Sequence, residues 1–464
     1  MHSGVNKKAI LVTMLMTAFI SASNMSMINV ALPVIGRELA MDAVLLGWVV
    51  AAHLLATASF QVPLGKFADI FGRRKIFLIG TIVFTVTTFI GGLSNSPAIL
   101  ILSRGMTGVG SAMIITTGLA ILTSVFPPEE RGHAIASNMA AIYLGISLGP
   151  LLGGVLTEYL GWRSIFFVSS AVGLVSVTLV FWKLKEEWAE ASGEGFDYHS
   201  SIVFVLGISA AMYGFSELPS FPGIVFFVAG MLGLIFFTRL EGRVKNPILD
   251  IRVFRNNRVF LLSNLAVLIN YCGTYAYTFL MSLYLQYILG YPPKTAGIVL
   301  VAQPAFMTFF ALISGKVADI FTPRYVATTG LALNCIGLLM LSLLGEGSAL
   351  WYVIFSLGVF GMGGGLFSSP NANMTMSSVD NRSLGVASGT IATMRSAGMI
   401  LSMGITMILF SLYIGNTEVT AGYNQEFLTS MRAAYIIFAA LCFGGIFVQL
   451  SARKGSGRRR DRKY

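Results

Sequence analysis

Long apolar stretches separated by short polar segments run through the whole chain. Many of them hold ~18–25 residues, the length at which an α-helix crosses a bilayer. A helix is expected because it satisfies its own backbone hydrogen bonds where no water is available. The pattern predicts an all-α polytopic membrane protein with fourteen spans, at residues 9–35, 44–64, 76–94, 97–125, 134–158, 164–183, 200–217, 221–240, 258–287, 295–315, 325–345, 349–373, 385–412 and 430–451.

A short charged segment between the second and third spans occurs again in the second half of the chain. Residues 65–75 read GKFADIFGRRK, and residues 315–325, 250 positions later, read GKVADIFTPRY. So close a match in a polar segment indicates two related halves of six spans each, with two additional spans between them (6 + 2 + 6). The predicted units are residues 1–185, 186–257 and 258–452, followed by a basic tail at 453–464.

The composition also points to a membrane protein. Charged residues make up 11% of the chain, whereas soluble globular proteins contain about 25%. The formal net charge is +11, but the basic residues gather in the loops on one side, as the positive-inside rule describes. This distribution argues against nucleic acid as a partner. It predicts a cell membrane location with both termini cytoplasmic and the basic tail lying against an anionic leaflet.

Several kinds of chemistry are not indicated by the sequence. Cys272, Cys335 and Cys442 lie in apolar spans and show no disulfide or metal-binding spacing. There is no P-loop for ATP and no recognisable catalytic constellation, so we expect neither an enzyme nor a cofactor. Residues 1–35 lack a cleavage site and are apolar for too long to be a signal sequence, so they form the first span. The lack of a targeting extension fits a prokaryotic inner membrane.

A few polar residues lie inside the predicted spans, where an uncompensated polar group is costly. We expect them to line a path for the substrate or for protons: Asn24, Asn29, His53, Arg104, Tyr275 and Arg395. His53 is either a proton carrier or a neutral histidine that is hydrogen-bonded between helices. Arg104 is either functional or an arginine that reaches water at the outer interface. The nearby Gly108 and Gly110 favour a close-packed, cavity-lining face for Arg104.

None of the twenty acidic residues lies deep inside a span. Glu158 and Glu217 lie near the outer ends and are further candidates for carrying protons. With Arg104 and Arg395 as the charges inside the spans, a cationic compound would gain only aromatic and dipolar contacts. The sequence therefore leaves room for neutral, zwitterionic or anionic amphiphilic substrates.

The fifth predicted span carries a stripe of small residues: Gly145, Gly149, Pro150, Gly153 and Gly154. Glycines four positions apart let another helix approach closely, and a proline inside a helix favours a kink. Such a stripe alone usually indicates plain helix packing, but it is much more specific in combination with the charged segment.

These motifs together resemble the major facilitator superfamily. Residues 65–75 are similar to its signature loop between the second and third helices, and Gly145–Gly154 resemble the antiporter motif of its exporters. Arg104 matches the arginine of their fourth-helix motif, and fourteen spans with Asn29–Pro33 resemble the fourteen-helix drug:proton antiporters. The resemblance implies two six-helix bundles around a central cavity, which rock between inward-open and outward-open states.

Three residues depart from the family pattern. Asn24 stands where the family usually has an aspartate, His53 where it often has a tyrosine, and Thr107 where a glutamine is expected. Because Asn24 cannot exchange a proton, the usual acidic coupling site is missing at that position.

The repeated charged segment is interpreted as a conformational latch. An aspartate is stabilised beside the N-terminus of another helix, so we expect Asp69 to face the start of the thirteenth span at residues 380–382. By the internal symmetry, Asp319 would face residues 130–131, and both contacts would close the cytoplasmic side. The latch residues are Gly65, Asp69, Gly72, Arg73, Arg74, Asp319, Arg324, Asp380 and Arg382.

The sequence thus predicts a secondary active transporter that exports small amphipathic compounds, of the multidrug type, in exchange for protons. An alternative within the same fold is export of one metabolite or lipid-like molecule without proton coupling, or uptake, which the antiporter-like motif disfavours. A membrane sensor or scaffold would need a sizeable soluble domain, and the segments between the spans are too short to form one.

Overall fold

The computed structural model describes residues 7–242, 257–379, 384–415 and 424–452. Fourteen helical segments in this part of the chain are long and apolar enough to cross a membrane, which confirms the predicted number of spans. The helices are α1 (Lys7–Glu38), α2 (Ala43–Phe71), α3 (Arg73–Gly92), α4 (Pro97–Val125), α5 (Pro128–Leu160), α6 (Arg163–Lys183), α7 (Tyr198–Ser216), α8 (Phe221–Glu241), α10 (Arg258–Thr274), α11 (Tyr277–Leu283), the π-helix η1 (Tyr284–Ile288), α12 (Pro293–Leu300), α13 (Ala302–Ile320), α14 (Pro323–Ser342), α15 (Leu350–Met376), α16 (Leu384–Tyr413) and α17 (Asn424–Ser451).

The helices form two bundles with the same internal packing. In the first bundle, α1 packs against α5, α2 against α4, and α3 against both α4 and α6. In the second, α10 packs against α16, α13 against α15, and α14 against both α15 and α17. The order of partners is the same, so the repeat in the sequence is also a repeat in the fold. The additional helices α7 and α8 pack on each other, and α7 also touches α2 and α16.

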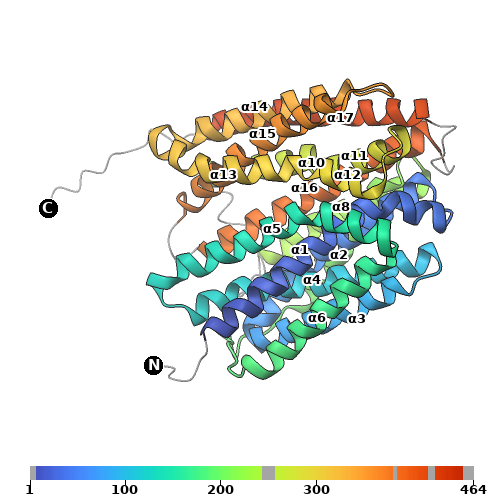
Figure 1. Ribbon diagram of the computed structural model, residues 1–464. Helices are drawn as coiled ribbons and strands as arrows, with labels where there is room; N and C mark the ends of the chain where they lie inside the picture. Colours follow the sequence, from blue (N-terminus) through green and yellow to red (C-terminus); the bar gives the residue numbers. More distant parts are fainter. Residues whose placement is uncertain (1–6, 243–256, 380–383, 416–423, 453–464) are drawn as a thin grey trace.

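Figure 1 shows the first bundle in blue to green below the second in yellow to red, with the start of α1 and the end of α17 at one end. The end at which α1 begins and α17 ends is called the near end here, and the opposite end the far end. The drawn helices of the two bundles lie together toward the far end and spread apart toward the near end.

One pair of matching arginines makes the same contact in both bundles. Arg74, near the start of α3, donates from Nε to the carbonyl oxygen of Leu184, just after α6. Arg324, near the start of α14, donates from Nη1 to the carbonyl oxygen of Leu450 in the last turn of α17, at 3.4 Å. Each arginine therefore ties the third helix of its bundle to the sixth.

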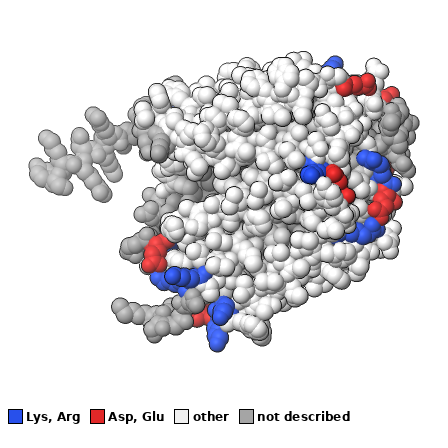
Figure 2. Space-filling view, viewed as in Figure 1, with Lys and Arg blue, Asp and Glu red and all other residues white. Residues whose placement is uncertain are grey.

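The outer surface has an uncharged band between the two ends. Figure 2 shows Lys, Arg, Asp and Glu gathered toward the ends, with few of them between. Large apolar side chains on the middle turns of their helices, including Leu174, Phe309 and Phe443, are more than half exposed. An exposed apolar band of this kind fits the acyl chains of a bilayer, so the chain is a multi-pass membrane protein.

The first two spans of the second bundle are not the continuous helices predicted at 258–287 and 295–315. The first is interrupted between α10 and α11, where the backbone N–H of Ala276 donates to the Ser402 hydroxyl of α16, at 3.0 Å. The second is interrupted at Val301, close to Pro304, which lacks the N–H that would bond to Leu300. Interrupted helices in transporters commonly line the transport path.

Candidate functional site

Three glycines of the α5 stripe bring α5 into close contact with α1, inside the first bundle. A Cβ atom added at Gly145, Gly149 or Gly153 would lie 2.6 Å from an atom of α1. Side chains at these positions are excluded because the nearest atoms belong to the α1 backbone or its first side-chain carbon. This face of the stripe therefore fixes the α1–α5 pair.

The other two residues of the stripe face the second bundle. A Cβ atom on Gly154 would lie 2.5 Å from the carbonyl oxygen of Pro293, and one on Gly297 of α12 would overlap the carbonyl oxygen of Pro150. The α5 and α12 backbones thus touch at the far end. The stripe serves two contacts, one within a bundle and one between bundles.

Hydrogen bonds join the bundles near the same end. Gln286 of η1 donates from Nε2 to the carbonyl oxygen of Val30 at 2.8 Å, and the Tyr287 hydroxyl donates to that of Pro33 at 3.0 Å. Both acceptors lie on the far-end half of α1. These contacts and the α5–α12 packing close the far end of the protein.

Arg104 of α4 lies in the interior, with 2% of its surface exposed. Its Nη1 donates to Asn24 Oδ1 of α1 at 3.0 Å, and its Nε donates to the carbonyl oxygen of Val49 of α2 at 3.2 Å. The guanidinium therefore links three helices of the first bundle through neutral acceptors. An arginine that merely reaches water at the interface would be exposed, so the structure favours the interior role.

His53 lies beside this arginine, and its buried Nδ1 has no hydrogen-bond partner among the described residues. Asn29, further along α1, also has a buried oxygen, Oδ1, without a partner there. The α2 and α4 backbones touch beside His53, where a Cβ atom on Gly108 would overlap the His53 carbonyl oxygen. Thr107 instead contacts α3, with its hydroxyl 2.9 Å from that of Thr87. Thr107, one of the three departures noted in the sequence, therefore lies at the contact between α3 and α4.

Tyr275 brings the second bundle to the same place. It lies at the break between α10 and α11, and its hydroxyl is buried without a hydrogen-bond partner among the described residues. It interacts electrostatically with Arg104 across the bundles. Asn24, His53, Arg104 and Tyr275 therefore gather in one buried polar centre, whereas Arg395 lies on the near-end side of it, about three turns into α16.

The two acidic candidates lie at the far end and not in this centre. Glu158 Oε2, in the last turn of α5, accepts a hydrogen bond from the backbone N–H of Lys294 at 3.0 Å. Lys294 Nζ also contacts the Tyr159 hydroxyl at 3.0 Å. Glu217 directly follows α7 and belongs to its turn into α8. Of the two carboxylates, Glu158 takes part in the contact between the bundles.

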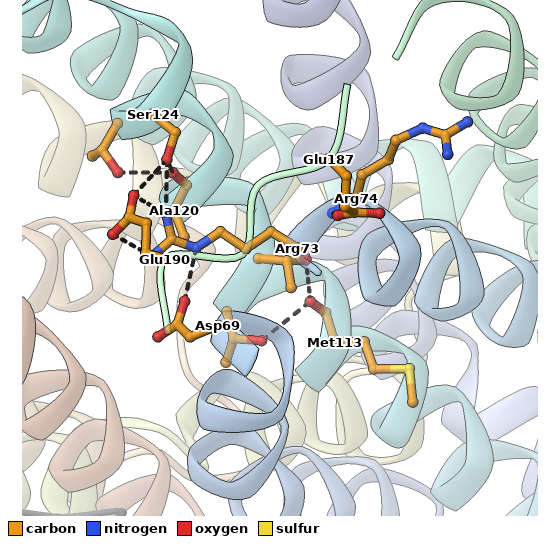
Figure 3. Close-up of polar contacts among 11 residues, drawn as sticks. Asp69, Arg73, Arg74, Met113, Ala120, Ser124, Glu187 and Glu190 are labelled. Carbon is orange, nitrogen blue, oxygen red and sulfur yellow. Dashed lines mark hydrogen bonds and ion pairs between the residues drawn. The ribbon is translucent and has the colours of Figure 1, made fainter. Parts of the chain in front are cut away.

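At the near end, Arg73 organises the charged segment (Figure 3). Its Nε donates to Asp69 Oδ1 at 2.7 Å and its Nη1 to Ser124 Oγ at 2.7 Å. Glu190 accepts from Nη1 at 2.7 Å and from Nη2 at 3.1 Å. Gly72, with φ of +117°, makes the turn between α2 and α3 that allows this arrangement.

The linker after α6 completes this cluster. Glu187 accepts from the backbone N–H of Arg74 at 2.8 Å, and Lys66 pairs with Glu194 at 2.5 Å. The Arg73 N–H donates to the Trp188 carbonyl oxygen at 2.8 Å. Sequence reasoning did not assign these glutamates to the site. The sequence feature that could have pointed to them is the acidic character of this linker, which complements the basic residues of the charged segment.

Part of the predicted latch cannot be placed. Asp380 and Arg382 lie outside the described residues, as does the side chain of Asp319. Glu130 pairs with Lys7 at 2.9 Å. Asp69 faces Arg73 within its own bundle, and its pairing with residues 380–382 stays a prediction.

Removing the charge of Glu190 should loosen the linker. Arg73 hydrogen-bonds the Glu190 carboxylate and holds its pKa below the usual value. A lowered pKa means that the contact stabilises the fold above the usual glutamate pKa and is lost as the pH falls through the lowered value. In Glu190→Gln, hydrogen exchange of residues 184–197 should be faster and lose this pH dependence. The effect should be about 0.5–1 kcal/mol because the pair is partly exposed.

Glu186→Gln is the matched control, since Glu186 makes no hydrogen bond or ion pair with the charged segment among the described residues. Equal exchange rates in the two variants at neutral pH would show that the Arg73–Glu190 pair does not hold the linker.

The family model of the Major Facilitator Superfamily matches residues 14–403 and 264–463. The chain belongs to this superfamily. It is therefore a membrane transporter and not an enzyme. Riboflavin transporter RibZ of Clostridioides difficile (strain 630) is 27% identical over 445 residues, which cover 95% of this chain and 96% of RibZ. Multidrug resistance protein Stp of Mycobacterium tuberculosis (strain CDC 1551 / Oshkosh) is 30% identical over 396 residues, 84% of this chain and 73% of Stp.

Solved structures share the fold. A bacterial homologue of the human lysosomal transporter Spinster, in an inward-facing and unoccupied conformation, matches with a TM-score of 0.68 and 18% identity, over 98% of this chain and all of that one. The nucleoside transporter NupG matches with a TM-score of 0.65 and 14% identity, over 96% of this chain and all of NupG.

Proposed function

We propose that this chain is a secondary active exporter of small amphipathic compounds, which works by alternating access in exchange for protons. The observation that carries the proposal is a buried polar centre between two repeated bundles whose far end is closed. The basic residues of the charged segment lie at the near end, which fits a cytoplasmic near end in a cell membrane. Similarity to the multidrug resistance protein Stp supports a multidrug type of export.

A second candidate function is transport of one specific metabolite. It is supported by the similarity to the riboflavin transporter RibZ, which extends over nearly the full length of both chains. A neutral planar compound would suit a centre that includes Tyr275 and, among the described residues, no carboxylate. Competition between riboflavin and unrelated amphiphiles distinguishes a narrow specificity from a broad one.

Two residues support proton exchange by their positions. His53 lies in the buried centre, and Glu158 joins the bundles at the far end through Lys294. A proton on Glu158 would remove the negative charge beside Lys294 and weaken the far-end contact. Glu217 is the third candidate carrier, at the α7–α8 turn.

Purified protein in liposomes with an imposed pH gradient tests the proposal, with cationic, neutral and anionic dyes as probes. We expect at least one dye to accumulate against its gradient, and an ionophore that dissipates the pH gradient should stop this. His53→Gln should reduce uptake to the level that the dye gradient alone drives, whereas His199→Gln, at the near end, should not. Absence of movement for every dye contradicts export, and movement indifferent to pH contradicts proton exchange.

A further inference from the structure

Arg395 is a half-buried arginine inside α16 without an acidic partner. In the part of the chain that the structure describes, no carboxylate lies within ion-pair distance of its guanidinium. Every Asp and Glu of the fourteen spans lies in the first or last turn of its helix. A charge inside a membrane protein is costly unless it is paired or solvated. The described residues thus offer Arg395 no counter-ion at this depth.

Neighbouring residues of α16 define where Arg395 points. The Ser396 hydroxyl donates to Gln61 Oε1 of α2 at 3.3 Å, and a Cβ atom on Gly398 would lie 2.5 Å from the carbonyl oxygen of Leu268 of α10. A helix turns by about 100° per residue, so Arg395 points between the directions of Ser396 and Gly398. It faces the space between α2 and α10.

Tyrosines from both bundles surround this space. Tyr143 lies on the same stripe of α5 as Pro150 and Gly154, which face the second bundle. It is within electrostatic range of both Arg395 and Tyr271. Tyr271 of α10 packs against Gly398, with its Cβ 2.9 Å from the position of an added Cβ. Arg395 and the two tyrosines therefore face one another across the bundle interface.

The same face continues toward the polar centre. Tyr275 follows Tyr271 by one helical turn, and its buried hydroxyl has no hydrogen-bond partner among the described residues. Arg104 lies within electrostatic range of Tyr275. The region thus holds two guanidinium groups and an unpartnered hydroxyl donor. These groups suit a negatively charged ligand and repel a cation.

We propose that this region is the substrate site, and that it recognises an aromatic or amphipathic carboxylate or sulfonate whose anionic group binds Arg395. This inference rests on the proposed transport function and adds the class of substrate. The planar guanidinium offers a two-pronged contact to a carboxylate or sulfonate. Tyr143 and Tyr271 contact the apolar body of the ligand, and the Tyr275 hydroxyl donates a hydrogen bond to it.

Binding of three matched probes to the full-length protein in lipid nanodiscs tests this site. Naphthoate, naphthamide and naphthylmethylammonium share one aromatic body and carry negative, neutral and positive charge. Equilibrium dialysis against protein-free nanodiscs corrects for partition into the lipid. We expect naphthoate to bind roughly ten- to a hundredfold more tightly than naphthamide, as a charge-assisted contact predicts, and the ammonium compound to bind least.

Variants identify the residue responsible. Arg395→Gln should lower naphthoate affinity to the naphthamide level and leave naphthamide unchanged. Arg395→Lys should retain part of the preference because it keeps the charge but loses the planar fork. Arg432→Gln is the matched control. Arg432 is another arginine inside a span, and it donates to the Ser342 carbonyl oxygen at the far end of the second bundle. It should bind naphthoate as the parent does.

Three outcomes would overturn the proposed substrate site. The ammonium probe could bind most tightly, naphthoate could fail to bind, or Arg395→Gln could lower the affinity for all three probes equally. If Arg395→Gln fails to fold, Arg395→Lys replaces it, and it must weaken naphthoate more than naphthamide. If naphthoate binds in an Arg395-dependent way but is not transported across the liposome membrane, export is contradicted and the binding site is still supported. If the ammonium probe is exported at the same rate by the parent and by Arg395→Gln, the proposed site is contradicted and export is still supported.

Discussion

Gly297→Val should hold the far end open and abolish transport while the protein remains folded. A Cβ atom at position 297 would overlap the carbonyl oxygen of Pro150 and lie 3.4 Å from the Cα of Gly154. These are backbone atoms, so no change of rotamer relieves the overlap, and α5 and α12 must separate. Moving a two-state equilibrium from 1:99 to 99:1 takes ~5.5 kcal/mol, which a backbone overlap of this kind can supply.

The measurements are dye transport in liposomes and hydrogen exchange of residues 293–300, which should become faster as the far end opens. Gly105→Val is the matched control, because a Cβ atom at that α4 position meets no atom within 4 Å. Gly297→Ala is a milder variant in case valine prevents folding. Transport by Gly297→Val at the parent rate would show that the α5–α12 contact is not needed to close the far end.

Much of the fold could be predicted from local features of the sequence. Apolar length alone identifies the fourteen spans, because a bilayer sets the length of a helix and forbids unpaired backbone groups. The repeat of residues 65–75 at 315–325 predicts two halves, and Arg74 and Arg324 make equivalent contacts in the structure. The interruption at 275–276 could not be predicted, because the hydroxyl that accepts the Ala276 N–H there belongs to Ser402, more than a hundred residues away.

The candidate site was only partly visible in the sequence for the same reason. Polar residues inside apolar spans are conspicuous, so Asn24 and Arg104 were found, and the structure brings them into contact. Tyr143 was missed because a single tyrosine in an apolar helix carries no signal until its neighbours are known. The partner of Arg73 was also missed, since Glu190 lies 117 positions away and only the folded linker brings the two charges together.

Arg104→Met should abolish transport and change stability little. Burying an ion costs several kcal/mol, and the acceptors of Arg104 among the described residues, Asn24 and Val49, are both neutral. Each of the two hydrogen bonds to this charged donor returns ~1.5–3 kcal/mol, so together they only offset that cost. Methionine removes both the cost and the gain, so the free energy of unfolding should stay within about 1–2 kcal/mol of the parent. A buried charge that adds so little to stability is expected to serve function.

Transport should fall at least a hundredfold, equivalent to ~2.7 kcal/mol, because the polar centre loses the charge that faces Tyr275. Thermal unfolding followed by intrinsic fluorescence and dye transport in liposomes measure the two effects on the same preparation. Arg432→Met is the matched control, since Arg432 is also bonded to a carbonyl oxygen inside the protein, that of Ser342 at 3.2 Å. If Arg104→Met unfolds readily while its folded fraction transports normally, Arg104 serves the fold of the first bundle and not the passage of substrate.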